Sequence, residues 1–220
     1  MSNSRILSTT QQKFLELFGK TSLANTFYLT GGTALAGFYI PYRLSEDLDF
    51  FSENEVNTQE ILVFIRSVKK TISYTNLDIS TSFNRNLIFL KFKKQPTLKT
   101  EFTYFPFPQI EKPEKMDGIA IDSPIDIAVN KLFTIYQKPR SRDFIDLYMV
   151  VKKYNFSLED IIKKARIKFD WSIDYIQLGA QFLESKELKD FPHILKPIDE
   201  SKWRDFFIEE AKKLKSKILS

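Results

Sequence analysis

Two aspartates, Asp47 and Asp49, stand two residues apart in a stretch in which polar and apolar side chains alternate, D-L-D-F-F. The alternation predicts a strand with one buried face, on which side chains at i and i+2 point the same way. Their Cα atoms would lie roughly 6–7 Å apart. Carboxylates this close repel each other unless a cation lies between them, and oxygen ligands suit a hard divalent ion. The pair predicts a Mg²⁺ site, although a solvated strand face has the same spacing.

A glycine pair precedes the two acids. Residues 27–30 read as a short strand, Gly31-Gly32 as a tight turn, and residues 33–40 as a helix that must end before Pro41. The free N–H groups and the positive dipole at a helix start favour phosphate. Taken alone, the glycine pair could be only a turn. Together with the acids it predicts a metal site and a phosphate site side by side.

The remaining pattern predicts an α+β fold. A mixed sheet flanked by helices would occupy residues 1–115, and a helical domain would occupy residues 116–220, with the proline-rich stretch 106–115 as the linker. The first part would contain helices at 8–18 and 58–68, a hairpin of strands 72–83 and 87–93, and a strand at 98–105. The second part would contain helices beginning at Pro124, Ser141, Ser157 and Ile173 and one spanning Trp203 to Leu219.

Composition limits the chemistry further. The 220 residues contain no cysteine and a single histidine, His193, which excludes disulfides and thiolate nucleophiles and argues against multi-histidine metal sites. Acid–base and metal chemistry must therefore depend on Asp, Glu, Lys and Arg. No secretory signal or membrane-length apolar run is present, so we expect a soluble cytoplasmic protein. A net charge of +5 permits an anionic partner such as RNA.

The first block of residues, Gly31-Gly32-Thr33 followed by Arg43, Ser45, Asp47 and Asp49, resembles the nucleotidyltransferase family of the AbiEii/AbiGii toxins. The hallmark of that family is Gly-Gly-Ser/Thr followed by Arg-x-Ser-x-Asp-hydrophobic-Asp. Its Lys-x-Asp before a Tyr-Pro segment corresponds to Lys99-Thr100-Glu101 and Tyr104-Phe105-Pro106. Its second block matches Asp126 to Lys131 and Arg140 to Tyr148. The sequence departs from the family at Pro41-Tyr42, where Gly-His is frequent, and at Glu101, where Asp is typical.

The resemblance implies a polymerase-β-like nucleotidyltransferase fold in which a neighbouring strand supplies a third carboxylate. Asp47, Asp49 and Glu101 would then bind Mg²⁺, with Glu101 serving as a ligand or as the base, although a solvent-facing Lys/Glu strand face fits its spacing equally well. Lys131 would offset phosphate charge. The residues that would hold or position the nucleotide are Gly31, Gly32, Thr33, Arg43, Ser45 and Asp143, while Arg140, Arg142 and Asp146 could equally tie helices together.

The implied reaction passes a nucleoside monophosphate from an NTP to an acceptor and releases pyrophosphate. By resemblance the acceptor is RNA, with tRNA expected, and the protein is the toxin of a toxin–antitoxin or phage-defence system. Proteins with a similar core instead modify small molecules such as aminoglycosides, or proteins. Two alternatives stay open from the residues. A catalytically silent module would only hold a nucleotide or an antitoxin in the same pocket. A two-metal nuclease would use similar acids without a triphosphate cradle.

Overall fold

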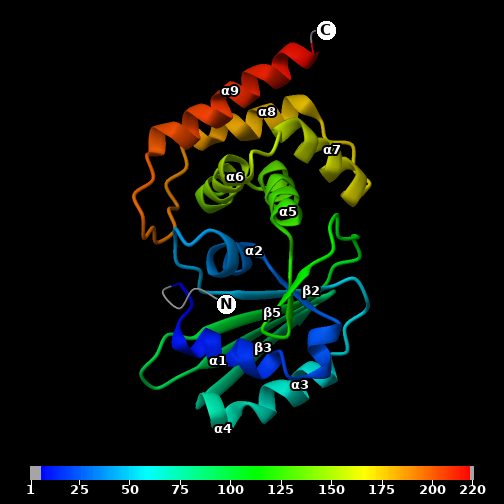
Figure 1. Cartoon of the computed structure of the whole chain (residues 1–220), viewed down its shortest axis with the longest axis vertical. Helices are drawn as coiled ribbons and strands as arrows, with labels where there is room; N and C mark the ends of the chain where they lie inside the picture. Colours follow the sequence, from blue (N-terminus) through cyan, green and yellow to red (C-terminus); the bar gives the residue numbers. More distant parts are fainter. Residues whose placement is uncertain (1–5, 219–220) are drawn as a thin grey trace. The chain divides into compact units, whose positions relative to one another are not determined.

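The protein divides into two compact units, and the division falls between Ser123 and Pro124. The computed structural model describes residues 6–218, with side chains to residue 216 (Figure 1). The segments of the first unit in which polar and apolar residues alternate form strands of one seven-stranded mixed sheet. The strand order is β3-β4-β5-β2-β1-β7-β6. The strands are β1 (Tyr28–Thr30), β2 (Leu48–Ser52), β3 (Asn76–Ser82), β4 (Arg85–Lys91), β5 (Leu98–Tyr104), β6 (Glu114–Met116) and β7 (Ile119–Ile121).

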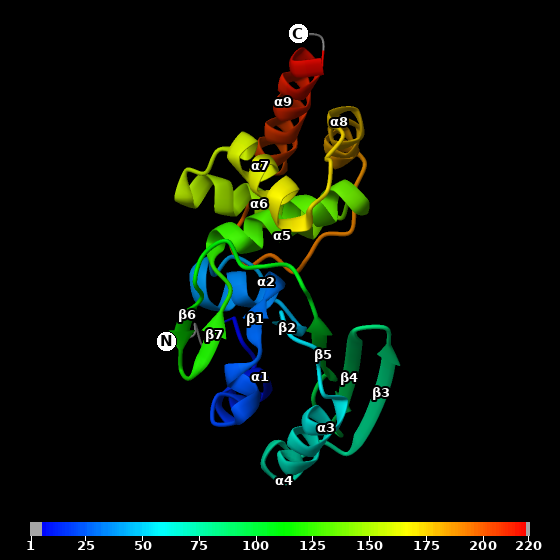
Figure 2. The same ribbon diagram turned by 90° about the vertical axis from the view of Figure 1, so that its right-hand side faces the viewer.

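The centre of the sheet is mixed in direction. β2 pairs antiparallel with β1 and parallel with β5, and β1 pairs parallel with β7. The two hairpins, β3–β4 and β6–β7, form the opposite edges of the sheet (Figure 2). The structure thus confirms the predicted α+β class, with helices beside a mixed sheet and a helical second part.

Phenylalanines form the core beneath the central strands. Phe50 of β2 stacks on Phe102 of β5 with ring centroids 4.9 Å apart. Phe14 and Phe18 of α1 (Thr9–Phe18) and Phe64 of α3 (Thr58–Ser67) pack edge-on or tilted against these rings and each other. Because alternate residues of a strand point to opposite faces, burial of Phe50 on this face directs Asp49 to the other.

The short α4 (Lys69–Ile72) ends at Ser73, which has a left-handed φ of 60°, so β3 begins at residue 76 rather than at 72 as predicted. The helix predicted for residues 33–40 consists of a four-residue turn, α2 (Gly31–Ala34), and a π-helical turn, η2 (Leu35–Tyr39). Ile40 and then Pro41 follow η2, and because proline has no N–H to donate, the helix cannot continue through Pro41.

The predicted linker, residues 106–115, runs into a hairpin whose first strand, β6, begins at Glu114 and whose second, β7, ends at Ile121. Asp117 and Gly118 turn it with φ values of 51° and 83°, the pair of positive angles that an Asp-Gly hairpin turn needs. Because this hairpin extends the sheet through β7, the first unit continues to Ser123 instead of ending at residue 115. The Asp-Gly dipeptide was the available signal for it.

The second unit is helical and closes around aromatic side chains. Phe144 of α6 (Ser141–Tyr154) packs edge-on against Phe207 of α9 (Glu200–Ile218), which also contacts Phe182 of α8 (Tyr175–Leu183). Trp203 is fully buried. Leu219, the predicted end of the last helix, lies outside the described residues. Within residues 6–218 no helix is both long and apolar enough to cross a membrane. The helices are α5 (Pro124–Gln137), α6 (Ser141–Tyr154), α7 (Leu158–Phe169), α8 (Tyr175–Leu183), η3 (Glu184–Lys186) and α9 (Glu200–Ile218).

Candidate active site

The central strands place three acids on the sheet face opposite the phenylalanine core. Asp47 immediately precedes β2, and Asp49 is the second residue of that strand. In the parallel ladder Asp49 is the register partner of Glu101 on β5, and partners in a ladder direct their side chains to the same face. Asp49 also pairs with Thr30 at the end of β1. The end of β1, directly before the glycine turn, therefore lies beside the acids.

Gly31 approaches Asp49 closely. It has a φ of +71°, and a Cβ built on it would lie 2.8 Å from Asp49 Oδ2. A side chain at this position would strain the backbone and also displace the carboxylate. Glycine thus leaves the bend backbone and the Asp49 carboxylate adjacent, with no side chain between them.

The other residues of the first block hold the loop that leads to Asp47. The Thr33 hydroxyl, which is completely buried, donates to the main-chain carbonyl of Asp47 and lies 2.8 Å from Ser45 Oγ. Arg43 is 4% exposed, donates to the carbonyl of Leu44 and lies against Gly32, where an added Cβ would come within 2.2 Å of Arg43 Nη2. In this structure these side chains are engaged in fixing the loop.

The acids pair with cations of the chain itself. Lys99 Nζ lies 2.6 Å from Asp47 Oδ2. Arg85 makes a bidentate pair with Glu101, with both N–O distances at 2.7 Å, and Thr103 Oγ1 donates to the same carboxylate. Within the described part of the chain, no three His, Asp or Glu side chains are grouped as a ready metal site. The predicted trio of Asp47, Asp49 and Glu101 shares one face without converging.

Glu101 is ionised at neutral pH despite its burial. Burial by itself raises the pKa of Glu101, but the hydrogen bonds from Arg85 and Thr103 outweigh it and hold that pKa below its ordinary value. The carboxylate is therefore charged, and both of its oxygens accept hydrogen bonds from Arg85.

The second block forms an ion network in the helical unit. Lys131 Nζ on α5 lies 2.6 Å from Asp143 Oδ1 and 2.7 Å from Asp146 Oδ2 on α6. Arg140 adds a pair to the second oxygen of Asp143 at 2.7 Å. The two aspartates are fully buried, whereas Arg142 is exposed. The structure therefore brings Lys131, Asp143 and Asp146 together as a tie between two helices, which is one of the two roles that the sequence left open for Asp146.

A family model described as the nucleotidyl transferase AbiEii toxin of a type IV toxin–antitoxin system matches residues 13–215 of the chain. The chain belongs to this family. An AbiEii nucleotidyltransferase toxin is the class that the two motif blocks indicated.

The chain is also similar to a curated protein and to two solved structures. "Uncharacterized protein aq_aa25" of Aquifex aeolicus is 33% identical over 174 residues, which cover 77% of this chain and 80% of that protein. The solved structure of JHP933 from Helicobacter pylori has a TM-score of 0.61 at 23% identity and covers 94% of this chain and 90% of its own. The structure of a second nucleotidyltransferase-like protein from H. pylori has a TM-score of 0.62 at 22% identity, and the match covers 96% of this chain and 97% of that one. At these identities the structures show a shared fold.

The residues of this AbiEii-family chain fit a divalent cation at the acids. Asp49 of β2 and Asp47, the residue directly before that strand, present carboxylate oxygens, the ligands that hard divalent ions prefer. The close approach at Gly31 leaves bend amides next to Asp49, a suitable place for phosphate oxygens beside the ion. Glu101 faces the same way, but Arg85 engages it.

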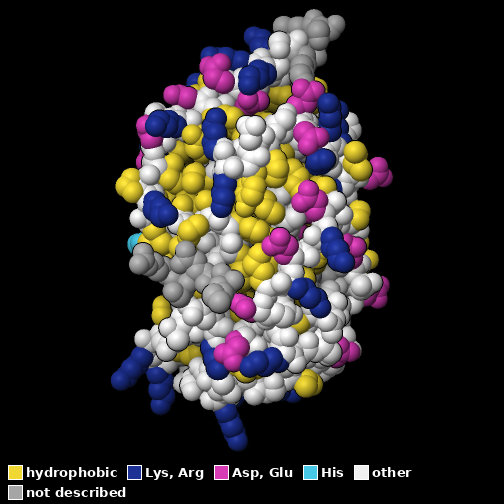
Figure 3. Space-filling view, viewed as in Figure 1, with side chains coloured by type: hydrophobic (Ala, Val, Ile, Leu, Met, Phe, Trp, Pro, Cys, Tyr) yellow, Lys and Arg dark blue, Asp and Glu magenta, His cyan; other side chains and the backbone are white. Residues whose placement is uncertain are grey.

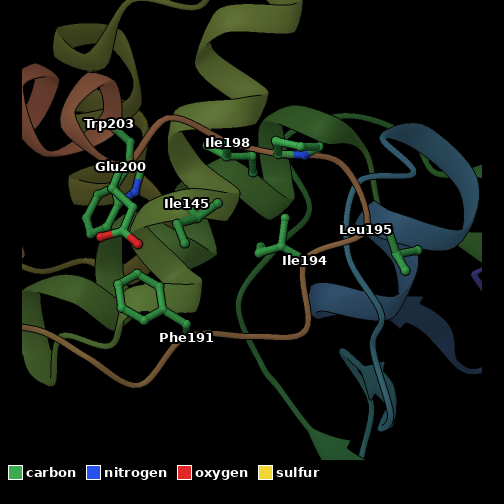
Figure 4. A pocket seen from close by; sticks show the side chains of 8 residues that line it. Ile145, Phe191, Ile194, Leu195, Ile198, Glu200 and Trp203 are labelled. Carbon is green, nitrogen blue, oxygen red and sulfur yellow. The ribbon is translucent and has the colours of Figure 1, made fainter.

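The pocket in the helical unit offers less chemistry. It has a volume of about 390 Å³, and its lining residues are mostly apolar, with Glu200 as the single charged side chain among them (Figure 4). Ile145, Ile198 and Trp203 point into it. An apolar lining with one carboxylate does not provide the paired acids that phosphoryl transfer needs. The paired acids Asp47 and Asp49 lie instead at the strand face of the first unit.

Two supporting residues, Gln11 and Asp122, were not predicted from the sequence. Gln11 on α1 donates from Nε2 to the carbonyls of Ser45 (2.8 Å) and Glu46 (3.1 Å) and so anchors the loop before Asp47. Asp122, after β7, accepts from the Thr30 hydroxyl at 2.6 Å and fixes the residue that precedes Gly31. Both contacts join segments more than 30 residues apart, so local spacing carries no signal for them.

The hydrogen bonds from Gln11 to the loop before Asp47 lead to a first testable prediction. Replacing Gln11 by Leu leaves two carbonyls without these donors and also removes the acceptor for the Ser8 N–H. We expect the free energy of unfolding to fall by about 1–3 kcal/mol in urea titrations. The exposed Gln59 gives a matched control, Gln59→Leu, which should change it by less than about 0.5 kcal/mol. Equal effects of the two substitutions would contradict an anchoring role.

Arg85 makes a second, pH-dependent prediction. Arg85→Met removes the bidentate partner of a carboxylate that is 7% exposed, and we expect a loss of about 1–3 kcal/mol at pH 7. The pKa of Glu101 lies below its ordinary 4.5, so its contribution to stability is present above that pH and is lost as the pH falls through the folded-state pKa. The stability gap between wild type and variant should therefore narrow from pH 7 toward pH 3.

Urea titrations at several pH values measure that gap. The exposed Arg66 supplies the control, Arg66→Met, whose small effect should not vary with pH in this way. A gap for Arg85→Met that stays constant across the acid range would show that Glu101 does not titrate with this pair.

Proposed function

We propose that this AbiEii-family chain is a Mg²⁺-dependent nucleotidyltransferase that transfers a nucleoside monophosphate from an NTP to an RNA acceptor, with tRNA as the expected acceptor. One observation carries the proposal: the Gly31 bend lies directly against the Asp49 carboxylate, so a triphosphate on the bend and a cation on the acids would be neighbours. Family membership supports the class of reaction. NTPs and tRNA are cytoplasmic, so the proposal places the protein in that compartment.

In this proposal Asp47 and Asp49 hold the ion. When bound, Mg²⁺ supplies charge neutralisation of the triphosphate and of the pyrophosphate that leaves. The amides at Gly31 and Gly32 bind phosphate oxygens, and glycine is needed there because the backbone must come close. Thr33, Arg43 and Ser45 contribute by holding the loop, as their buried contacts indicate. The chain's role is mainly positioning and electrostatics.

The remaining site residues keep the roles that the resemblance implied, as proposals. Glu101 adds negative charge beside Asp49. It acts as a metal ligand or as the base through a carboxylate oxygen that also accepts a hydrogen bond from Arg85. Lys131 offsets phosphate charge, and Asp143 orients it, as their 2.6 Å contact suggests. Arg140 and Arg142 then bind substrate or, like Asp146, serve the helix network.

The acceptor and the antitoxin are also proposed from the family. The chain carries a net charge of +5, but lysines and arginines are interspersed with acidic side chains on the face shown in Figure 3. On that face RNA would meet dispersed charge, so recognition there would depend on shape and on individual phosphate contacts. Membership in a type IV toxin–antitoxin family supports a cognate antitoxin as the partner that limits the activity.

Incubation with total RNA, Mg²⁺ and each of the four α-³²P-labelled NTPs in separate reactions tests the proposal. We expect label to appear in RNA, in the tRNA size range, with one NTP preferred. Shortening of the RNA without label would favour a nuclease. Neither change, with nucleotide still bound, would favour a silent binding module. Omission of Mg²⁺ is the control that tests metal dependence in the same gel.

A further inference from the structure

Asp47 is already neutralised by a cation that belongs to the protein. Lys99 Nζ lies 2.6 Å from Asp47 Oδ2. The pair follows from the fold, because β5 runs parallel to β2 with Leu48 opposite Thr100, which sets the two residues before them side by side. The ammonium also lies close enough to Glu101 to lower the pKa of that carboxyl. The Lys99 ammonium therefore lies among the same acids, Asp47 and Glu101, that are proposed to face the metal.

The ion pair between Lys99 and Asp47 is accessible to other cations, which can replace the ammonium. Their side chains are 33% and 32% exposed, so water and ions reach the pair. An ion pair at this exposure is weak, unlike the buried pair between Lys168 and Asp126, whose side chains are 1% and 0% exposed. A divalent ion bound at Asp47 would repel an ammonium this close, so both cannot hold the same carboxylate oxygen favourably.

We propose that Lys99 is a resident counter-ion that competes with the divalent metal for Asp47 and is displaced when the metal binds. The inference rests on the proposed function, since it requires a metal at Asp47 and Asp49. Its consequence is that the nucleotide-free protein binds metal weakly. Bound NTP offers the released ammonium new anionic partners, so nucleotide and metal bind cooperatively. Lys99 thereby makes occupation of the metal site depend on the substrate.

Mn²⁺ binding without nucleotide, followed by electron paramagnetic resonance of the free ion, tests this directly. Lys99→Met is expected to tighten Mn²⁺ binding about fivefold, the factor that corresponds to a surface ion pair worth about 1 kcal/mol. Lys99→Arg keeps a competing cation and should bind Mn²⁺ as the wild type does. Lys91→Met is the matched control, because Lys91 pairs with the exposed Asp78 on β3. It should leave the affinity unchanged.

The outcomes separate this inference from the proposed function. If Asp49→Asn abolishes Mn²⁺ binding but Lys99→Met leaves it unchanged or weaker, Lys99 does not compete and the inference is overturned while the metal site stands. If neither wild type nor Lys99→Met binds Mn²⁺, both fail. Lys99→Gln, with thermal unfolding as a folding check, repeats the test if Lys99→Met is unstable. Weaker coupling between Mn²⁺ and NTP in Lys99→Met supports the inference independently of activity.

Discussion

Replacing Asp49 by Asn is expected to lower the rate of nucleotidyl transfer by about a thousandfold while the protein stays folded. The amide has the size of the carboxylate but no charge, so it is a poor ligand for a hard divalent ion. Metal-based charge stabilisation contributes several kcal/mol to the barrier, and each 1.36 kcal/mol corresponds to about a tenfold change in rate. Asp49 is the acid that the Gly31 bend approaches most closely, which makes its charge the most sensitive to remove.

The measurement is the initial rate of label transfer to RNA at saturating NTP. Asp78→Asn supplies the matched control, since Asp78 lies on the edge strand β3 with a side chain that is 55% exposed. That variant should transfer at the wild-type rate. Retention of more than about a tenth of the activity by Asp49→Asn would show that this carboxylate does not hold the ion.

Gly31→Ala is expected to lower transfer by about a hundredfold, beyond what its loss of stability explains. The φ of +71° costs a non-glycine residue about 1–2 kcal/mol, which should appear in urea unfolding. The new Cβ would also lie 2.8 Å from Asp49 Oδ2 and push the carboxylate away. A displacement of about 1 Å near reacting groups costs about a hundredfold in rate.

Gly118→Ala separates the two effects. Gly118 has a φ of +83°, and its added Cβ would meet the carbonyl oxygen of Gly19 at 2.8 Å rather than an acid. This variant should lose similar stability but keep its specific activity at a temperature where it is folded. If Gly31→Ala kept the same specific activity as Gly118→Ala, the bend would not be part of the site.

The fold could be predicted as far as local patterns reach. The alternation around Asp47 and Asp49 identified β2 and the face that its acids share, because the period of two is a direct consequence of strand geometry. Pro124 marked the start of α5 correctly, since proline suits the first helical turn. The β6–β7 hairpin was missed because its strands are only three residues long and follow three prolines.

The contacts of the candidate site could not be predicted from the sequence. The spacing of the first block indicated which residues to consider, but it could not show that the Thr33 hydroxyl donates to the main-chain carbonyl of Asp47. The pairs between Lys99 and Asp47 and between Arg85 and Glu101 depend on strand order and register. The buried pair of Lys168 with Asp126 joins positions 42 residues apart, and helix packing alone creates it.

The central claim is that Asp47 and Asp49 share a divalent cation with a triphosphate held at the Gly31–Gly32 bend. A crystal grown with Mn²⁺ and a non-hydrolysable NTP, with the metal located by its anomalous scattering, tests this most directly. The account predicts a manganese peak bonded to both carboxylates and to a phosphate oxygen, with Lys99 released from Asp47. A nucleotide bound elsewhere, with Lys99 still paired to Asp47 and no metal at the acids, would contradict it.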